Sequence, residues 1–148
     1  MSDLDHFIRW YKNPLSVLYG DDDAGFPILM ITFPLLERYL RNLTEADPKT
    51  KTFRRALINI FPVLLDDPTA EKFWDIFRHG LLHQATLKNI PRLRFAGVNN
   101  AASEIQSERS GFVVSPVKFS RRVISEIEAD FTTFKKSATE RDALAQIY

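Results

Sequence analysis

The chain has 148 residues, of which 45% are hydrophobic and 26% charged, and these values are ordinary for one soluble globular domain. It contains no cysteine, which excludes a disulfide framework, a thiolate zinc site and thiol catalysis. The net charge of +1 gives no long-range field, so contact with a polyanion would depend on local basic clusters. The N-terminus lacks the pattern of a signal peptide, and the longest apolar run, residues 26–36, is too short to cross a bilayer. We therefore expect a soluble, cytoplasmic protein with no membrane partner.

The first part of the chain carries apolar residues at spacings of three and four, which predict helices. The first helix should run from residue 2 to about residue 12. Pro14 should interrupt it, and a looser turn should follow. The second should cover residues 26–43 and continue through Pro34, because the apolar pattern stays in register beyond that proline.

Two proline-containing signals predict the next helices. Asp47-Pro48 and Asp67-Pro68 each have the form of an N-cap followed by a first-turn proline. The fourth helix, which starts at the second signal, should run through residues 73–84.

The pattern changes after residue 87. Residues 92–96 and 111–115 resemble half-buried strands, and we expect them to pair as a hairpin with a long connection. Ser115-Pro116 should begin a last helix that continues toward residue 147. The prediction is a mainly α protein, a single domain over residues 1–148 with four to five helices in a bundle and a β-hairpin before the last helix.

Residues 73–84 hold the residue types that metal-independent RNA cleavage requires, namely Arg78, His79 and His83. An imidazole can act as base toward the 2′-hydroxyl or as acid toward the leaving 5′-oxygen at neutral pH. A guanidinium stays charged and can hold two phosphate oxygens. Because one histidine does not comfortably fill both roles, a two-fold dimer with facing copies would complete the site. The structural alternative is that Arg78 pairs with Glu37 or Asp75 and that His83 packs between helices.

The string of residues 77–84 resembles the signature of the HEPN superfamily, in which an arginine and a polar residue are followed by spacers and a histidine. Arg78, His79 and His83 stand at the three specific positions. The surroundings are similar too, with helices before the motif, Glu37-Arg38-Tyr39-Leu40 late in the second helix, and a variable hairpin and a final helix after it. The resemblance spans nearly the whole chain, although only the motif is specific.

This resemblance implies an RNA endonuclease that uses no metal or other cofactor, acts as a homodimer, and commonly serves as a toxin or an antiphage defence component. Carried over, Arg78 would hold the scissile phosphate and His83 would be the acid and base. His79 would orient Arg78 or contact phosphate, and Glu37 would support Arg78, with Asp75 as the other nearby acid.

The residues after the motif bear on substrate and partner. Lys88, Arg92 and Arg94 are expected to follow the RNA backbone. An antitoxin or the product of a neighbouring gene is a possible partner in this family. One subgroup carries a modifiable tyrosine two residues after the motif histidine, and this chain has Ala85 there, so that type of toxin–antitoxin pair is not expected.

Two alternatives stay open. The first is a non-catalytic HEPN-type module that dimerises or binds a partner or a nucleotide, since a retained motif does not establish turnover. The second is a metal-binding helical bundle, because Asp75, His79 and His83 recur every four residues and would share one helix face. A metal would need a further ligand, for which Glu37 and His6 are candidates.

Overall fold

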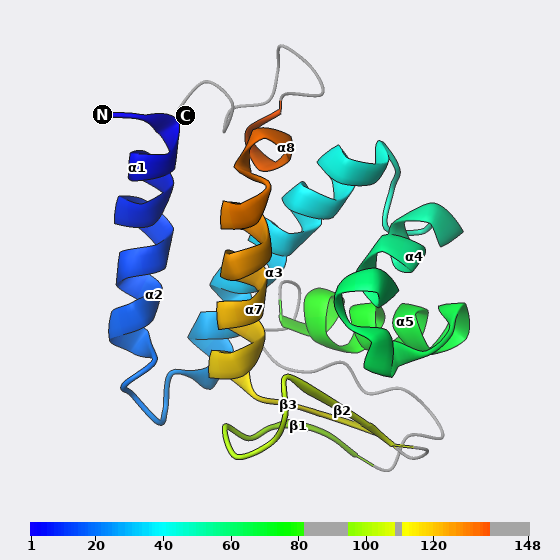
Figure 1. The fold of residues 1–148 in the computed structure, drawn as a ribbon. Coiled ribbons are helices and arrows are strands. Elements are labelled where there is room, and N and C mark those ends of the chain that lie inside the picture. The colour runs from blue at the N-terminus through cyan, green and yellow to red at the C-terminus, as the bar shows by residue number, and fades with distance from the viewer. Residues whose placement is uncertain (82–94, 109–110, 137–148) are drawn as a thin grey trace.

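The computed structural model describes residues 1–81, 95–108 and 111–136. The protein is mainly helical, with a small three-stranded sheet at one end, as Figure 1 shows. In chain order the helical elements are α1 (Asp3–Phe7), the π-helix η1 (Ile8–Lys12), α2 (Asn13–Leu18), α3 (Gly25–Thr44), α4 (Lys51–Ile60), the short 3-10 helix η2 (Pro62–Leu64), α5 (Asp67–Trp74), the π-helix η3 (Asp75–His79), α7 (Pro116–Ala129) and α8 (Phe131–Lys135). The strands are β1 (Phe95–Val98), β2 (Ile105–Glu108) and β3 (Gly111–Val114). Within the described ranges, no helix combines the length and the apolar character needed to cross a membrane.

The first helical segment runs through Pro14, so the expected break at that residue is wrong. The turn before it is the π-helix η1, which closes with a hydrogen bond from the Asn13 N–H to the Ile8 carbonyl. Pro14 then lies in the first turn of α2, where a missing backbone N–H costs little. The wide π turn gives the pyrrolidine ring room, and the helix continues.

The second predicted helix is confirmed as α3, which continues through Pro34 as expected. Ser115 is also confirmed as the N-cap of α7, where its hydroxyl accepts a hydrogen bond from the Lys118 N–H. The α4 cap is Thr50 rather than Asp47, because the Asp47 carboxylate accepts instead from the Lys49 N–H at 2.9 Å.

The start of α5 also differs by one residue from the prediction. Asp66, not Asp67, is its N-cap, and the Asp66 carboxylate accepts from the Thr69 N–H at 2.9 Å. This leaves the Asp67 side chain free to make a tertiary contact, described below.

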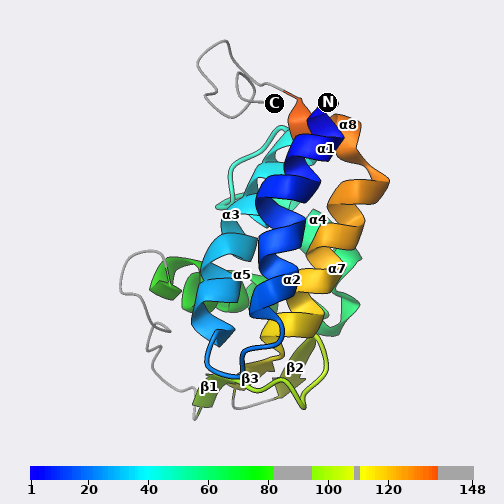
Figure 2. The same ribbon diagram turned by 90° about the vertical axis from the view of Figure 1, so that its left-hand side faces the viewer.

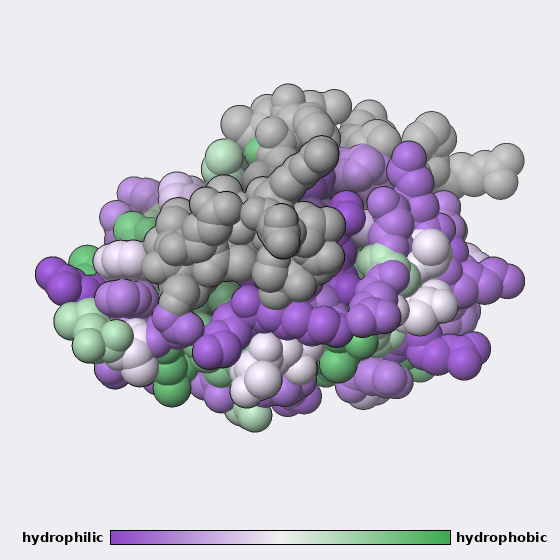
Figure 3. Space-filling model, turned by 90° about the horizontal axis from the view of Figure 1, so that it is seen from above, coloured by the Kyte–Doolittle hydropathy of each residue, from purple (hydrophilic) through white to green (hydrophobic). Residues whose placement is uncertain are grey.

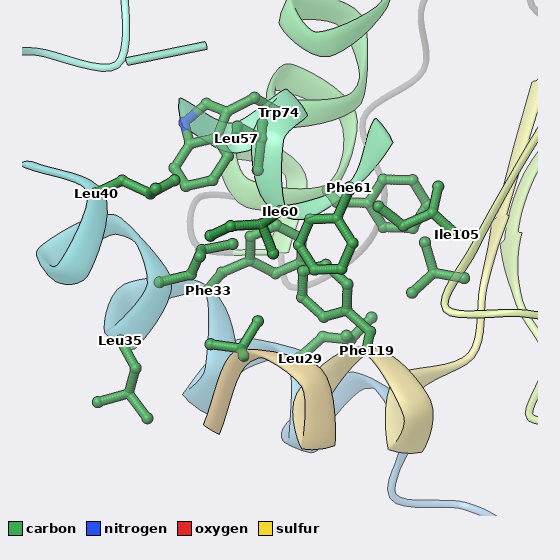
Figure 4. Packing of buried hydrophobic residues seen from close by; sticks show 14 of the residues in the cluster. Leu29, Phe33, Leu35, Leu40, Leu57, Ile60, Phe61, Trp74, Ile105 and Phe119 are labelled. Carbon is green, nitrogen blue, oxygen red and sulfur yellow. The ribbon is translucent and has the colours of Figure 1, made fainter. Parts of the chain in front are cut away.

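Aromatic rings of α3, α4, α5 and α7, together with Phe61 directly after α4, form one part of the core (Figure 4). Phe33 of α3 stacks on Phe119 of α7 with ring centroids 4.9 Å apart, and Phe61 stacks on the same ring at 5.0 Å. Trp74 of α5 packs edge-on against Phe53 of α4 at 5.0 Å. These contacts join α4 and α5 to the α3–α7 pair.

The N-terminal helices lie along α3 and α7 on the opposite side, as Figures 1 and 2 show together. Phe7 packs edge-on against Phe134 of α8 at 5.2 Å. Farther along, the Tyr19 hydroxyl lies 2.7 Å from the Ser120 hydroxyl, which also accepts a hydrogen bond from Thr32 at 2.8 Å. A continuous polar contact therefore links α2, α3 and α7 inside the protein.

The sheet has the order β1-β3-β2, and its topology corrects the predicted hairpin. Of the segments expected to form that hairpin, residues 95–96 in β1 and 111–114 in β3 do pair, but they run parallel, with Phe95 opposite Gly111. Residues 92–94 of the first predicted strand lie outside the described residues. The antiparallel partner of β3 is β2, with Ile105 opposite Val114. A polar run treated as part of the connection thus supplies a strand. The last helical element described, α8, ends at Lys135, and the predicted continuation toward residue 147 lies outside the described residues.

Figure 3 views the protein from the end at which α1 begins and α8 ends. The coloured residues on this face are mostly hydrophilic, and the hydrophobic ones form small separate patches. This is the usual surface of a protein in water.

Candidate functional site

The predicted motif begins on a distorted helical segment. α5 passes without a break into the π-helix η3, which ends at His79 and is capped by the buried Gly80. Gly80 itself has ordinary right-handed helical angles, φ −57° and ψ −51°, so the local distortion lies in the turn before it. Single π turns inside helices widen the spacing of side chains and occur often at functional sites.

Arg78 and Glu37 form an ion pair that joins η3 to α3. The Arg78 Nη2 donates to Glu37 Oε2 at 3.0 Å, and Nε lies 3.0 Å from Oε1. The Nε–H is not aimed at an acceptor, so this second contact is an ion pair rather than a second hydrogen bond. The two side chains are only 18% and 16% exposed. The predicted contact between Glu37 and Arg78 is confirmed, and Asp75 is not the partner that holds the guanidinium.

A second arginine, Arg41, borders this pair one turn along α3. Its Nε lies 3.7 Å from Glu37 Oε2, and its Nη2 lies 3.8 Å from Asp47. Sequence reasoning did not assign Arg41 to the site, although its i, i+4 spacing from Glu37 is a signal for such a contact. Glu37 therefore faces two guanidinium groups, and the three side chains together keep one positive charge.

The Nη1 nitrogen of Arg78 makes no hydrogen bond to any described residue. Glu37 occupies the Nε–Nη2 edge of the guanidinium, which leaves a second edge able to donate. A guanidinium can bind two oxygens of a planar or tetrahedral anion through one edge. The geometry of Arg78 thus combines a fixed position with remaining donors.

His79 contacts Asp75 one turn earlier, with 3.2 Å between Nδ1 and Oδ1. When the imidazole is neutral, a proton on Nδ1 suits this contact and leaves the lone pair on Nε2. When it is protonated, the contact becomes an ion pair. Asp75 therefore orients His79, a role that differs from the support of Arg78 considered for it above.

The other predicted site residues, His83, Lys88, Arg92 and Arg94, lie outside the described residues. The metal alternative also needs His83. Among the side chains that the structure describes, no three His, Cys, Asp or Glu residues come together closely enough to hold a metal ion.

A pocket of about 600 Å³ adjoins η3 and was not predicted from the sequence. It is formed where the α3–α4 connection meets α4, α5 and η3, and its lining residues are Pro48, Lys49, Arg54, Glu71, Lys72, Trp74, Asp75 and His79. Two of these, Asp75 and His79, also belong to the motif region.

Arg54 and Asp67 stabilise one wall of the pocket. Arg54 Nε and Nη2 donate to the two oxygens of Asp67 at 2.7 and 3.1 Å, and Nη1 donates to the Lys49 carbonyl at 2.9 Å. The hydrogen bond from Arg54 lowers the pKa of the Asp67 carboxyl below its ordinary value. All three guanidinium nitrogens thus take part in holding α4, α5 and the α3–α4 connection together.

Sequence reasoning placed Trp74 in the core, which is confirmed, since the residue is only 5% exposed. Its indole nitrogen, however, is buried and has no hydrogen-bond partner among the described residues. In Figure 4 this nitrogen lies on the side of the ring that faces away from Phe119 and Phe61. Two features of the sequence could have pointed to this pocket. Lys72 stands directly before residues 73–84, and Lys49 directly follows Pro48.

Comparisons of the chain with protein-family models, with curated proteins and with solved structures found no match.

Proposed function

We propose that the protein is a HEPN-like, metal-independent RNA endonuclease that acts as a homodimer, with a composite site built from Arg78 and His83 of both subunits. The observation that carries this proposal is the fixed position of Arg78, which Glu37 holds from α3 while its Nη1 makes no hydrogen bond to any described residue. The mainly helical fold, with a sheet before the last helices, supports the resemblance of the motif to that superfamily.

Each residue has a defined part in the proposed reaction. His83 of one subunit takes the proton of the 2′-hydroxyl, and His83 of the other gives a proton to the leaving 5′-oxygen. Arg78 donates to the non-bridging oxygens, on which negative charge grows as the 2′-oxygen attacks phosphorus. His79, oriented by Asp75, contacts the phosphate or the adjacent arginine.

The surroundings of Arg78 fit a role in transition-state binding. An arginine held by a carboxylate loses little freedom when it binds the phosphate, so its donors are already in place. Arg41 adds a second cation at the same carboxylate. The proposed biological role is that of a toxin or an antiphage defence component in the cytoplasm, controlled by an antitoxin or a neighbouring-gene partner.

The test is cleavage of a fluorescent single-stranded RNA in excess EDTA by the parent protein, Arg78→Ala and His83→Ala. The parent should cut, and each variant should be slower by about 10²–10⁴-fold, the usual contribution of a positioned acid–base or charge-stabilising group. Arg121→Ala is a matched control, because Arg121 lies on α7 and stacks on Tyr19, away from η3.

Light scattering on the same samples checks the dimer. Variants that cut RNA as fast as the parent, or a parent that cuts only when a divalent metal is added, would contradict the proposed mechanism. A monomeric protein that still cuts RNA would contradict the composite site.

A non-catalytic module is the second candidate, and one observation favours it. The Arg78 side chain is only 18% exposed and already paired, as expected for an arginine whose role is to hold η3 against α3. In that case the parent would not cut RNA. A stable complex with the product of a neighbouring gene, unchanged by His83→Ala, would then identify the protein as a binding module.

A further inference from the structure

The pocket beside η3 has the size and location of a subsite for the nucleotide next to the cleaved phosphate. Its volume of about 600 Å³ lies within the range of small-molecule sites. His79 lines the pocket and follows Arg78 directly in the chain, so the pocket adjoins the helical turn that carries the proposed phosphate contact.

The charges around the pocket suit one phosphate rather than a metal or a cationic ligand. Lys49 and Lys72 are exposed, and neither has an ion-pair partner within 4 Å among the described residues. The two acids of the lining are already engaged, since Glu71 lies 3.8 Å from Arg54 and Asp75 contacts His79. The two lysines therefore remain as donors for an anion.

The interior of the pocket suits the edge of a heteroaromatic ring. The indole N–H of Trp74 can only donate, and a buried donor without a partner costs free energy until an acceptor reaches it. The nitrogen is covered in this conformation, so an acceptor reaches it only when neighbouring side chains move aside. Carbonyl oxygens and ring nitrogens of a nucleobase are such acceptors, and Pro48 and His79 offer ring surfaces on which a base can pack.

We propose that this pocket binds one nucleotide of a single-stranded RNA, with an acceptor on the base facing the Trp74 indole N–H and the phosphate between Lys49 and Lys72. The assignment of this nucleotide to an RNA substrate rests on the proposed ribonuclease function. Binding of the nucleotide itself does not require catalysis, and the two can be tested separately.

The chain contains only two tryptophans, which makes the test direct. In ¹⁵N-labelled parent protein the indole N–H groups of Trp10 and Trp74 give two signals, assigned with Trp10→Phe. The protein is titrated with the four nucleoside 5′-monophosphates, and with ribose 5-phosphate as the phosphate-only arm, up to about 10 mM. These ligands contain no phosphodiester bond, so cleavage cannot interfere.

At least one nucleotide should shift the Trp74 signal downfield and leave the Trp10 signal in place, whereas ribose 5-phosphate should leave the Trp74 signal unchanged. Lys49→Ala/Lys72→Ala should weaken nucleotide binding about five- to tenfold. The control Lys51→Ala/Arg55→Ala removes the same charge from α4 outside the pocket lining and should bind as the parent does.

A Trp74 signal that no nucleotide moves, or that moves together with Trp10, would overturn the inference. If RNA is cleaved but the Trp74 signal stays fixed, the pocket assignment fails alone. If nucleotides shift the signal but RNA is not cleaved, the ribonuclease proposal fails and the pocket stands as a nucleotide site.

Discussion

Replacing Glu37 with glutamine removes the negative charge that faces Arg78 and keeps the size of the side chain. The pair has N–O distances of 3.0 Å, and its side chains are 16% and 18% exposed. At an effective dielectric constant of about 20, charges about 4 Å apart attract by about 4 kcal/mol, and desolvation offsets much of that energy. We therefore expect a coupling energy of about 1–3 kcal/mol between Glu37 and Arg78.

The assay is a double-mutant cycle of Glu37→Gln and Arg78→Met, with urea unfolding followed by tryptophan fluorescence. The matched control is the Arg122–Glu126 pair of α7, which also has an N–O distance of 3.0 Å but exposes 41% and 31% of its side chains. Its coupling energy, from Arg122→Met and Glu126→Gln, should stay below about 0.5 kcal/mol. Equal coupling energies for the two pairs would refute the reasoning that burial makes the Arg78–Glu37 contact strong.

Three further predictions concern stability. Phe119→Ala should lower the free energy of unfolding by about 3–5 kcal/mol in urea titrations, because the fully buried ring stacks on two others, and a loss below about 1 kcal/mol would contradict the packing described. The Arg54 hydrogen bond lowers the folded-state pKa of Asp67, so the ionised Asp67 carboxylate stabilises the folded protein above the ordinary pKa of 3.8. This stabilisation is lost as the pH falls through the lowered value. Asp67→Asn should therefore be less stable at neutral pH and lose less stability on acidification, measured as urea midpoints against pH, and an unchanged profile would exclude this contribution. Leu65→Gly should raise the free energy of unfolding by about 1 kcal/mol in the same assay, because Leu65 has φ 64° and ψ −55° in a γ-turn and is 81% exposed, and a destabilised variant would show that this conformation is unstrained.

Periodic apolar patterns in the sequence were sufficient to predict the long helices. The apolar register on both sides of Pro34 correctly predicted that α3 continues through it. The same reasoning failed at Pro14, because the π turn that accommodates this proline leaves no mark in apolar spacing. The N-caps of α4 and α5 differ from the predictions because more than one polar residue precedes each helix. At α4, Thr50 accepts from the Phe53 N–H, whereas Asp47 accepts from the Lys49 N–H outside the helix.

The sheet shows a different limit of prediction from sequence patterns. The two stronger strand patterns were recognised and do pair, but their parallel direction depends on β2. That strand, Ile105–Glu108, is short and mostly polar, so its sequence alone favours a loop. Its position beside β3 comes from tertiary structure, since Ile105 is buried in the core.

For the site, residue types predicted the contact between Arg78 and Glu37 but not its surroundings. Arg41 joins the pair through helix geometry, a regular effect that sequence spacing can indicate. The pocket depends on the meeting of the α3–α4 connection with α5, segments whose adjacency no spacing rule predicts. The apolar pattern around Trp74 correctly predicted that this residue lies in the core. That pattern carries no information about whether the indole N–H has a hydrogen-bond partner.

The most direct measurement of the central proposal is the identity of the RNA products formed in excess EDTA, determined by mass spectrometry. The proposed attack by the 2′-hydroxyl should leave a 2′,3′-cyclic phosphate on the upstream fragment, and a 2′-deoxy substitution at the cleaved nucleotide should abolish cleavage there. Both results should depend on His83 and Arg78. Cleavage of the 2′-deoxy substrate at the same rate, or no cleavage of RNA by the dimeric parent protein, would contradict the proposed ribonuclease mechanism.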